Sequence, residues 1–229
     1  MGMLKLILVR HGETAWNREK VFRGRADIPL SQRGLRQAEL TGKALRGCHW
    51  LLVARPRARR GATSAVPEVI YTSPLQRSLR TAEAIARETG SRLISELALA
   101  DIDFGEWTGL PQAHVKERFP ELYKQWKSTP HLCQLPGGER LEQVWRRAGD
   151  FAHETVAKHQ GTVVIVTHRV VLKALILSAL GLGPEHFWIV RMDTCSISAL
   201  EHEKGRMILT LLNDTHHLAD ATDPGATDF

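Results

Sequence analysis

Two short apolar runs, each followed by a histidine, constrain the fold of this chain more than any other feature. Residues 6–9 (Leu-Ile-Leu-Val) lead into Arg10 and His11, and residues 163–166 (Val-Val-Ile-Val) lead through Thr167 to His168. Such runs are too short to span a membrane and read as strands buried on both faces of a sheet. Open α/β sheets bind ligands at the carboxyl ends of their strands. The pattern therefore predicts two central strands that deliver histidines to one ligand-binding edge.

Helical patterns alternate with the predicted strands along the chain. A helix is expected from the cap residue Ser31, a second from Ser73-Pro74, and a third after the turn at residues 136–139, through about Lys158. The alternation indicates an α/β protein with a mainly parallel sheet, and 229 residues suit one domain. Further strands are expected at residues 69–71, 196–200 and 208–212, the last two around a turn at 204–205.

The net charge and the cysteine content indicate which binding partners and which cellular compartment to expect. The formal net charge of +6 favours anionic partners, but the chain has only two Tyr and no basic run interleaved with aromatics. A phosphorylated small molecule is therefore preferred over nucleic acid. Three widely separated cysteines predict neither a disulfide framework nor a zinc site and fit the cytoplasm. No apolar run reaches membrane-spanning length, and the first strand starts almost at once, so we expect no membrane segment or signal peptide.

Several short motifs follow one another along the chain: Arg10-His11-Gly12-Glu13-Thr14 with Asn17, then Arg33-Gly34, then Ser73-Pro74-Leu75-Gln76-Arg77. In sequence and order these motifs resemble those of the histidine phosphatase superfamily, the phosphoglycerate mutase-like family. The resemblance covers residues 4 to 217 and implies a three-layer α/β/α sandwich with a mainly parallel central sheet and a small helical cap, here expected between 113 and 126.

The same resemblance implies a chemistry and assigns roles to residues. His11 would attack phosphorus and form a phosphohistidine. Arg10, Arg77 and His168, with help from Asn17, would hold the phosphoryl oxygens, and neither a metal nor another cofactor is needed. The pair Arg23-Gly24 would border the substrate. Many relatives carry an uncharged amide where this chain has Arg23, so the extra cation favours a second anionic group on the substrate. Likewise, Arg169 replaces a residue that is small in many relatives.

The proton donor departs from the family pattern. The family usually has Glu four residues before a glycine, here Gly105, and this chain has Asp101 at that position. Because Asp is shorter by one methylene, the backbone must lie closer to the leaving oxygen. Asp103 is the alternative donor.

Two segments are expected to lie outside the core of the single domain, residues 1–218. Residues 47–67 contain a basic run and look like a surface insertion, for which a solvated excursion is preferred over an anionic docking patch. Residues 219–229 are expected to form a disordered tail.

These observations predict a cytoplasmic phosphomonoesterase that hydrolyses a small phosphorylated metabolite. A phosphoglycerate mutase-type phosphoryl transfer is the first alternative, and a non-catalytic sensor of a phosphorylated ligand is the second. The adjacent His216 and His217 have no evident carboxylate partner, so no metal is expected there either. The sequence is compatible with a homodimer and does not identify the substrate.

Overall fold

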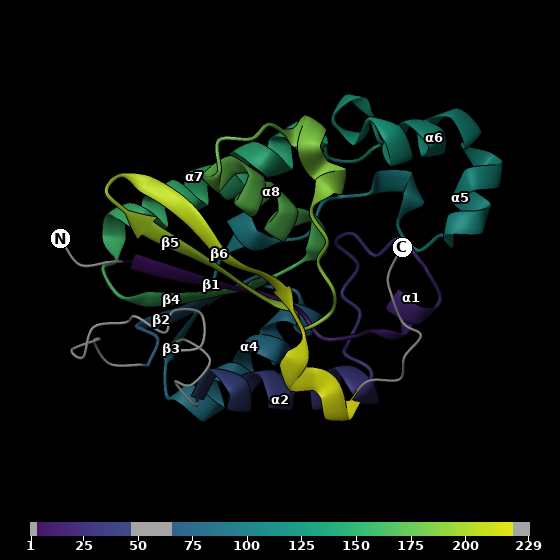
Figure 1. Ribbon diagram of the computed structural model, residues 1–229. Helices are drawn as coiled ribbons and strands as arrows, with labels where there is room; N and C mark the ends of the chain where they lie inside the picture. Colours follow the sequence, from purple (N-terminus) through teal and green to yellow (C-terminus); the bar gives the residue numbers. More distant parts are fainter. Residues whose placement is uncertain (1–3, 47–65, 222–229) are drawn as a thin grey trace.

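The computed structural model describes residues 4–46 and 66–221, which form a six-stranded mixed sheet between two helical layers (Figure 1). The strand order is β3-β2-β4-β1-β5-β6. The first four of these strands are mutually parallel, and β5 runs antiparallel to both β1 and β6. The strands are β1 (Leu4–Arg10), β2 (Val69–Thr72), β3 (Arg92–Ser95), β4 (Thr162–Thr167), β5 (Ile197–Glu203) and β6 (Arg206–Asp214).

Helices cover both faces of the sheet, so the predicted three-layer sandwich is confirmed. In Figure 1, α7 and α8 lie on one side of the sheet, α2 and α4 lie on the other, and α5 and α6 form a small cap at one end. None of the helices in the described ranges is long and apolar enough to cross a membrane. The helices are α1 (Ala15–Arg18), α2 (Gln32–Arg46), α4 (Gln76–Thr89), α5 (Gln112–Arg118), α6 (Pro120–Ser128), α7 (Leu141–Lys158) and α8 (Arg169–Ala179), with short 3-10 turns η1 (Leu97–Leu99), η2 (Gly105–Trp107), η3 (Pro130–Leu132), η4 (Pro184–Ile189) and η5 (His216–Ala221).

The central strand β1 is buried along its whole length because its side chains pack into two hydrophobic cores, one on each face of the sheet. Leu6 and Leu8 belong to the core under α7 and α8, whereas Ile7 and Val9 belong to the core under α2 and α4. This is the alternation that a strand imposes on successive side chains. Each buried aliphatic side chain contributes roughly 1.5–3 kcal/mol. These contributions hold β1 in register with β4, and they fix where β1 ends.

Two sequence-based boundaries need correction. Helix α4 begins at Gln76 rather than at Ser73, because the residue before a proline avoids helical dihedrals and Leu75 is still extended. Residues 219–221 belong to the turn η5, so the predicted tail does not begin at 219. Residues 222–229 and the predicted insertion, apart from Val66 and Pro67, lie outside the described residues.

Candidate active site

The loop after β1 sets the tautomer of His11. Its Nδ1 lies 2.7 Å from the carbonyl oxygen of Gly12. A carbonyl oxygen only accepts hydrogen bonds, so Nδ1 carries the proton and Nε2 keeps a lone pair. The sharp turn needs glycine at position 12, because a Cβ there would lie 2.5 Å from the carbonyl oxygen of Gly34. This tautomer leaves Nε2 with its lone pair, as the predicted role of His11 as a nucleophile requires.

Burial and positive charge keep His11 neutral. The side chain is buried, and burial is the largest cause that lowers its pKa well below the usual 6.5. The charges of Arg77, Arg10 and Arg23 lower this pKa further. Both effects disfavour the imidazolium form. A neutral imidazole is the form that the predicted attack on phosphorus requires.

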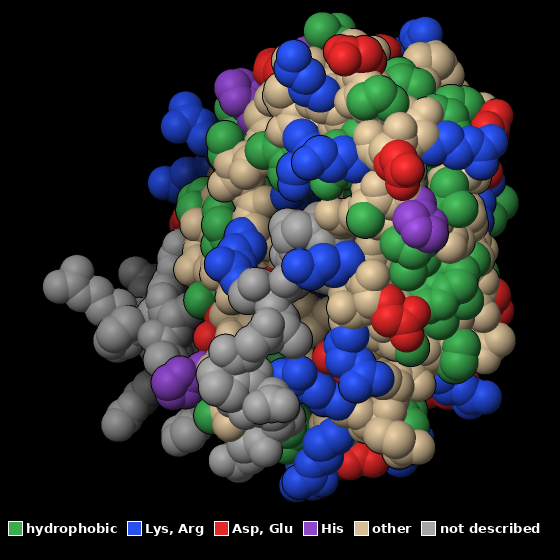
Figure 2. All heavy atoms as spheres, turned by 90° about the vertical axis from the view of Figure 1, so that its right-hand side faces the viewer, with side chains coloured by type: hydrophobic (Ala, Val, Ile, Leu, Met, Phe, Trp, Pro, Cys, Tyr) green, Lys and Arg blue, Asp and Glu red, His purple; other side chains and the backbone are tan. Residues whose placement is uncertain are grey.

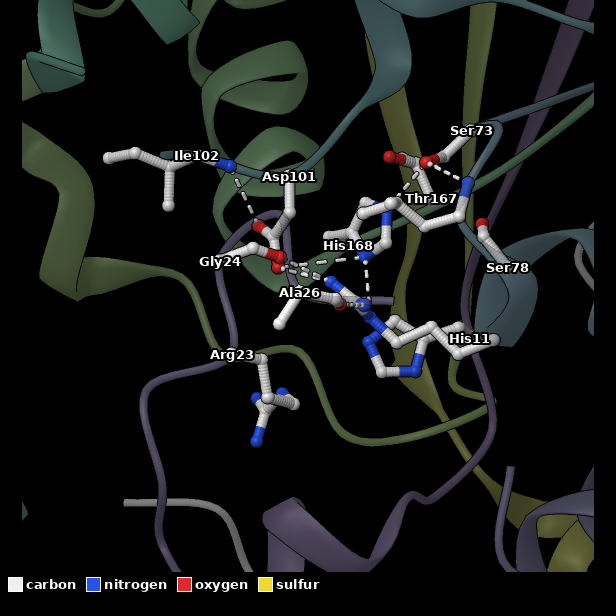
Figure 3. Close-up of polar contacts among 12 residues, drawn as sticks. His11, Arg23, Gly24, Ala26, Ser73, Ser78, Asp101, Ile102, Thr167 and His168 are labelled. Carbon is white, nitrogen blue, oxygen red and sulfur yellow. Dashed lines mark hydrogen bonds and ion pairs between the residues drawn. The ribbon is translucent and has the colours of Figure 1, made fainter. Parts of the chain in front are cut away.

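His168 lies beside His11, as the two strand ends predicted. The ring centroids are 5.1 Å apart, in the tilted arrangement that Figure 3 shows. Nδ1 of His168 accepts a hydrogen bond from Nε of Arg77 at 3.2 Å, because a guanidinium can only donate. The proton of neutral His168 is therefore on Nε2, which donates to the hydroxyl of Ser73 at 2.7 Å. Burial, followed by the charge of Arg77, lowers the pKa of His168 well below 6.5.

Arg77 is completely buried and ties four parts of the site together. Besides His168, its guanidinium donates to the carbonyl oxygens of Gly24 and Ala26, each at 2.7 Å, and to a carboxylate oxygen of Asp101 at 3.1 Å. Gly24 has φ +50°, and a Cβ there would approach the backbone of Phe104 and Ile102. Gly24 therefore positions Arg77 through its carbonyl group.

Arg10 and Asn17, two further predicted site residues, are held by contacts with the protein itself. Arg10 is completely buried, and its Nη1 donates to the carbonyl oxygen of Met192 at 2.8 Å. The side-chain oxygen of Asn17 accepts hydrogen bonds from the amide of Thr14 at 2.8 Å and from its hydroxyl at 2.9 Å. Asn17 thus closes the loop after His11. Its role toward phosphoryl oxygens stays a prediction.

A pocket opens beside His11 and combines charged and apolar walls. Its polar wall contains His11, Asp101, Arg23 and Arg169. Arg169 is the residue that sequence reasoning did not place in the site, although its position directly after a strand-end histidine was a usable signal. Val21, Phe22, Phe104 and Val170 form the apolar wall.

The two candidate proton donors have different surroundings. Asp101 lines the pocket, and Figure 3 shows its side chain converging with those of His11 and His168. The carboxylate oxygen Oδ1 of Asp101 accepts a hydrogen bond from the backbone amide of Ile102 at 3.0 Å. The side chain of Asp103 instead accepts a hydrogen bond from the backbone amide of Gly105 at 2.9 Å, and it thereby caps the turn η2. The geometry favours Asp101 as the donor.

An ion pair outside the pocket holds the segment that carries Asp101. Arg147 on α7 donates to both carboxylate oxygens of Glu139, at 2.8 and 3.0 Å. The same guanidinium donates to the carbonyl oxygens of Ala98, at 2.6 Å, and Asp101, at 3.4 Å. Arg147 is therefore a positioning residue for the proposed acid.

Arg147→Met should slow the cleavage of alkyl phosphates by about tenfold or more, because small displacements of a catalytic group cost up to about 10²-fold in rate. Aryl phosphates, whose leaving groups need little protonation, should lose much less. Steady-state kinetics on both substrate classes measure the difference. Arg146→Met is the matched control, because Arg146 is exposed and pairs only with Glu142 among its described polar contacts. Equal losses on both classes would contradict the positioning role.

His217 is a third histidine held in the neutral form. Its Nε2 lies 3.0 Å from the hydroxyl of Thr41 on α2, and burial lowers its pKa to about 4. Within residues 4–46 and 66–221, no three His, Cys, Asp or Glu side chains gather in a way that could hold a metal ion. His217 therefore packs the C-terminal turn η5 onto α2.

The protein should lose stability as the pH falls below 6.5. The unfolded chain binds protons on histidine near pH 6.5, whereas folded His11, His168 and His217 resist protonation. The stability that each buried neutral histidine supports is fully present above pH 6.5. Below pH 6.5, each such histidine lowers the free energy of unfolding by up to about 1.4 kcal/mol per pH unit. For His217 this window ends near its folded pKa of about 4. Urea unfolding at pH 7.5 and 5.0 should show a smaller acid-induced loss for His217→Gln than for the wild type, and identical losses would refute the assignment.

Comparison with known proteins agrees with this geometry. The family model of the histidine phosphatase superfamily (branch 1) matches residues 6–215. The chain is 35% identical to phosphoserine phosphatase 1 of Hydrogenobacter thermophilus over 219 residues, which cover 95% of this chain and 96% of that protein. The solved structure of Bacillus stearothermophilus YhfR is 30% identical, with a TM-score of 0.80 over 94% of this chain and 99% of that one. Phosphoserine phosphatase of Entamoeba histolytica in complex with 3-phosphoglyceric acid is 26% identical, with a TM-score of 0.78 over 94% and 99% of the two chains. Together with the site built around His11, these matches establish that the chain belongs to the histidine phosphatase superfamily.

Proposed function

We propose that this protein hydrolyses small phosphate monoesters through a phosphohistidine on His11. The observation that carries the proposal is the neutral, buried imidazole of His11, whose Nε2 lone pair is free to react in a pocket that also contains Asp101. Membership of a phosphatase superfamily and the phosphatase names of its relatives support hydrolysis of a small phosphorylated metabolite.

The first step transfers the phosphoryl group to the enzyme. Nε2 of His11 attacks phosphorus, the bond between phosphorus and the ester oxygen breaks, and protonated Asp101 gives its proton to that oxygen. The hydrogen bond from Nδ1 to the Gly12 carbonyl stabilises the positive charge that develops on the ring. Arg10 and Arg77 offset the charge on the phosphoryl oxygens.

The second step releases phosphate. Asp101, now a carboxylate, removes a proton from water while the water oxygen attacks phosphorus. The bond between phosphorus and Nε2 breaks, and His11 returns to its neutral form. Inorganic phosphate leaves and Asp101 is protonated again. The cycle uses one ester and one water and needs no other reactant.

The cap favours hydrolysis over mutase chemistry. A mutase must hold a bisphosphate away from water, which calls for cap cations that point at the pocket. Here Arg118 pairs with Glu106 and stacks on Phe119, and Lys127 stacks on Trp188. The pocket lining contains none of the cap cations Lys116, Arg118, Lys124 and Lys127.

A screen for phosphate release from phosphorylated metabolites, run in EDTA, tests the proposal. We expect release from small monoesters. A second assay, which distinguishes hydrolysis from mutase activity, incubates the protein with 3-phosphoglycerate and 2,3-bisphosphoglycerate. Formation of 2-phosphoglycerate much faster than inorganic phosphate would establish the mutase alternative, and binding of a monoester without any turnover would establish the sensor.

We also propose that the enzyme works in the cytoplasm. Cys133 and Cys195 are both free and buried in the described structure, as expected in a reducing compartment. Burial raises the pKa of these thiols to about 11 and about 12, so both are unreactive.

A further inference from the structure

We infer that Gln37 on α2 is a positioning residue for His11. Its side-chain amide holds the peptide group that follows Gly12, and this peptide group in turn keeps the proton of His11 on Nδ1. The inference rests on the proposed function and deepens it, because it assigns a buried residue that does not line the described pocket to the attack on phosphorus.

The peptide group between Gly12 and Glu13 has a hydrogen bond at each end. Its carbonyl oxygen accepts from Nδ1 of His11 at 2.7 Å, and its N–H donates to Oε1 of Gln37 at 2.9 Å. The two bonds form one chain from the glutamine amide through the peptide group to the imidazole, which we call the Gln37 relay. In such a chain each hydrogen bond polarises the next, so the bond to Gln37 makes the Gly12 carbonyl a stronger acceptor.

Two contacts fix the orientation of the Gln37 side chain. The backbone N–H of Glu13 can only donate, so the side-chain oxygen of Gln37, and not its nitrogen, must face it. Nε2 of Gln37 points the other way and donates to the hydroxyl of Thr194 at 3.3 Å. Gln37 is only 4% exposed, so this orientation is set by protein partners. The loop before β5 therefore takes part in holding the loop after β1.

Two glycines bring α2 close enough for this contact. A Cβ on Gly34 would overlap the carbonyl oxygen of Glu13, and a Cβ on Gly12 would lie 2.5 Å from the carbonyl oxygen of Gly34. Gln37 follows Gly34 by three residues, which places both on the same side of the helix. The glutamine side chain therefore reaches the loop at the point where the two backbones touch.

The Gln37 relay acts on the attack itself. As the bond from Nε2 to phosphorus forms, positive charge develops on the ring of His11, and its Nδ1–H becomes a stronger donor. A carbonyl group that Gln37 already holds in place accepts this hydrogen bond without having to reorient. Because the relay contacts the imidazole and not the substrate, it should contribute to kcat and leave KM nearly unchanged.

A neutral amide suits this position on α2 better than a carboxylate. A carboxylate would also accept the N–H of Glu13, but its negative charge would favour the imidazolium form of His11, which cannot attack. The charges of Arg77, Arg10 and Arg23 act in the opposite direction and lower the pKa of His11. Figure 2 looks onto the carboxyl edge of the sheet, where Lys and Arg side chains outnumber acidic ones around the middle of the face. An amide orients the peptide group and leaves this positive field unopposed.

Gln37→Leu, which removes the acceptor, tests the relay. First-turnover release of p-nitrophenolate from p-nitrophenyl phosphate reports the attack by Nε2. We expect this release to slow by about 10- to 100-fold, with KM close to that of the wild type, because a displaced catalytic group costs up to about 10²-fold in rate. In protein labelled with [¹⁵N]histidine, two-bond ¹H–¹⁵N NMR spectra should show the proton of His11 on Nδ1 in the wild type. In the variant, a measurable fraction should carry it on Nε2.

Three further variants make the result specific. Gln32→Leu is the matched control, because Gln32 is exposed on the same helix, and it should match the wild type in both measurements. Gln37→Glu keeps an acceptor for the N–H of Glu13 and should at pH 8 recover most of the rate lost in Gln37→Leu. Thr194→Val removes the partner of Nε2, so it should shift the tautomer in the same direction by less. This variant tests the relay even where Gln37→Leu does not fold.

The outcomes separate the Gln37 relay from the proposed function. A wild-type first-turnover rate in folded Gln37→Leu, or a proton that stays on Nδ1 of His11 as in the wild type, would overturn the relay. A Gln37→Glu variant as slow as Gln37→Leu would do the same, because the loss would then follow packing rather than the acceptor. The NMR measurement needs no turnover. Absence of phosphate release from every monoester would instead overturn the proposed function, and a shift of the tautomer would still support the relay.

Discussion

His11→Ala should reduce kcat/KM by at least about 10⁴-fold, or roughly 5 kcal/mol of transition-state stabilisation, on every phosphate monoester. The loss is this large because the described residues that line the pocket include no second imidazole. His168 lies beside His11, but Nδ1 of His168 accepts from Arg77 and its Nε2 donates to Ser73. Rapid quench with a ³²P-labelled substrate should show acid-labile labelling of the wild type and none of the variant.

A matched histidine elsewhere makes this result specific. His153 on α7 is exposed, so His153→Ala removes an imidazole without touching the pocket. This control should keep wild-type turnover and labelling. The His11 variant should still bind inorganic phosphate, because Arg10 and Arg77 remain. Turnover by folded His11→Ala at near wild-type rate would refute the nucleophile assignment.

Asp101→Asn should slow alkyl phosphates by about 10²- to 10⁴-fold, the usual contribution of a general acid. The asparagine amide keeps the shape of the side chain and its contact with Ile102, but it has no carboxyl proton to give. With p-nitrophenyl phosphate the rate of the first step should fall far less, since p-nitrophenolate leaves readily without protonation. Plotting log kcat/KM against leaving-group pKa should give a much steeper dependence for the variant than for the wild type.

Asp103→Asn is the control that decides between the two acids. Asp103 caps a turn through the amide of Gly105, so its replacement should alter stability slightly and leave the leaving-group dependence unchanged. A steep dependence in Asp103→Asn, together with a shallow one in Asp101→Asn, would move the role of donor to Asp103.

The local pattern predicted the elements that carry the two histidines. β1 and β4 are continuous apolar runs, and parallel pairing of such runs aligns their carboxyl ends. The register places Arg10 beside Thr167, and the amide of His11 donates to the Thr167 carbonyl at 2.9 Å. The long helix α7 ends at Lys158, as its periodicity indicated.

Other parts of the site depend on contacts that no local pattern records. Helix α8 is buried on all sides from Arg169 to Leu177, so its sequence has no polar stripe to show which residue faces the pocket. Ser73 was expected to start a helix, yet its hydroxyl serves His168, which lies 95 residues later. The pairing of Glu139 with Arg147 likewise follows from how α7 packs, not from spacing.

The position of β1 in the sheet also determines when the enzyme can become active during its synthesis. Among the described strands β1 leaves the ribosome first, but its two neighbours, β4 and β5, are encoded more than 150 residues later. Until then the apolar run of β1 is not paired with β4 or β5 and is exposed to association with other chains. The amide of Cys195, just before β5, closes onto the carbonyl groups of Arg10 and His11. The loop after β1 therefore reaches its final conformation only after residue 195 has been translated, and a ribosome stalled before residue 195 should carry a chain that cannot hold His11 in place.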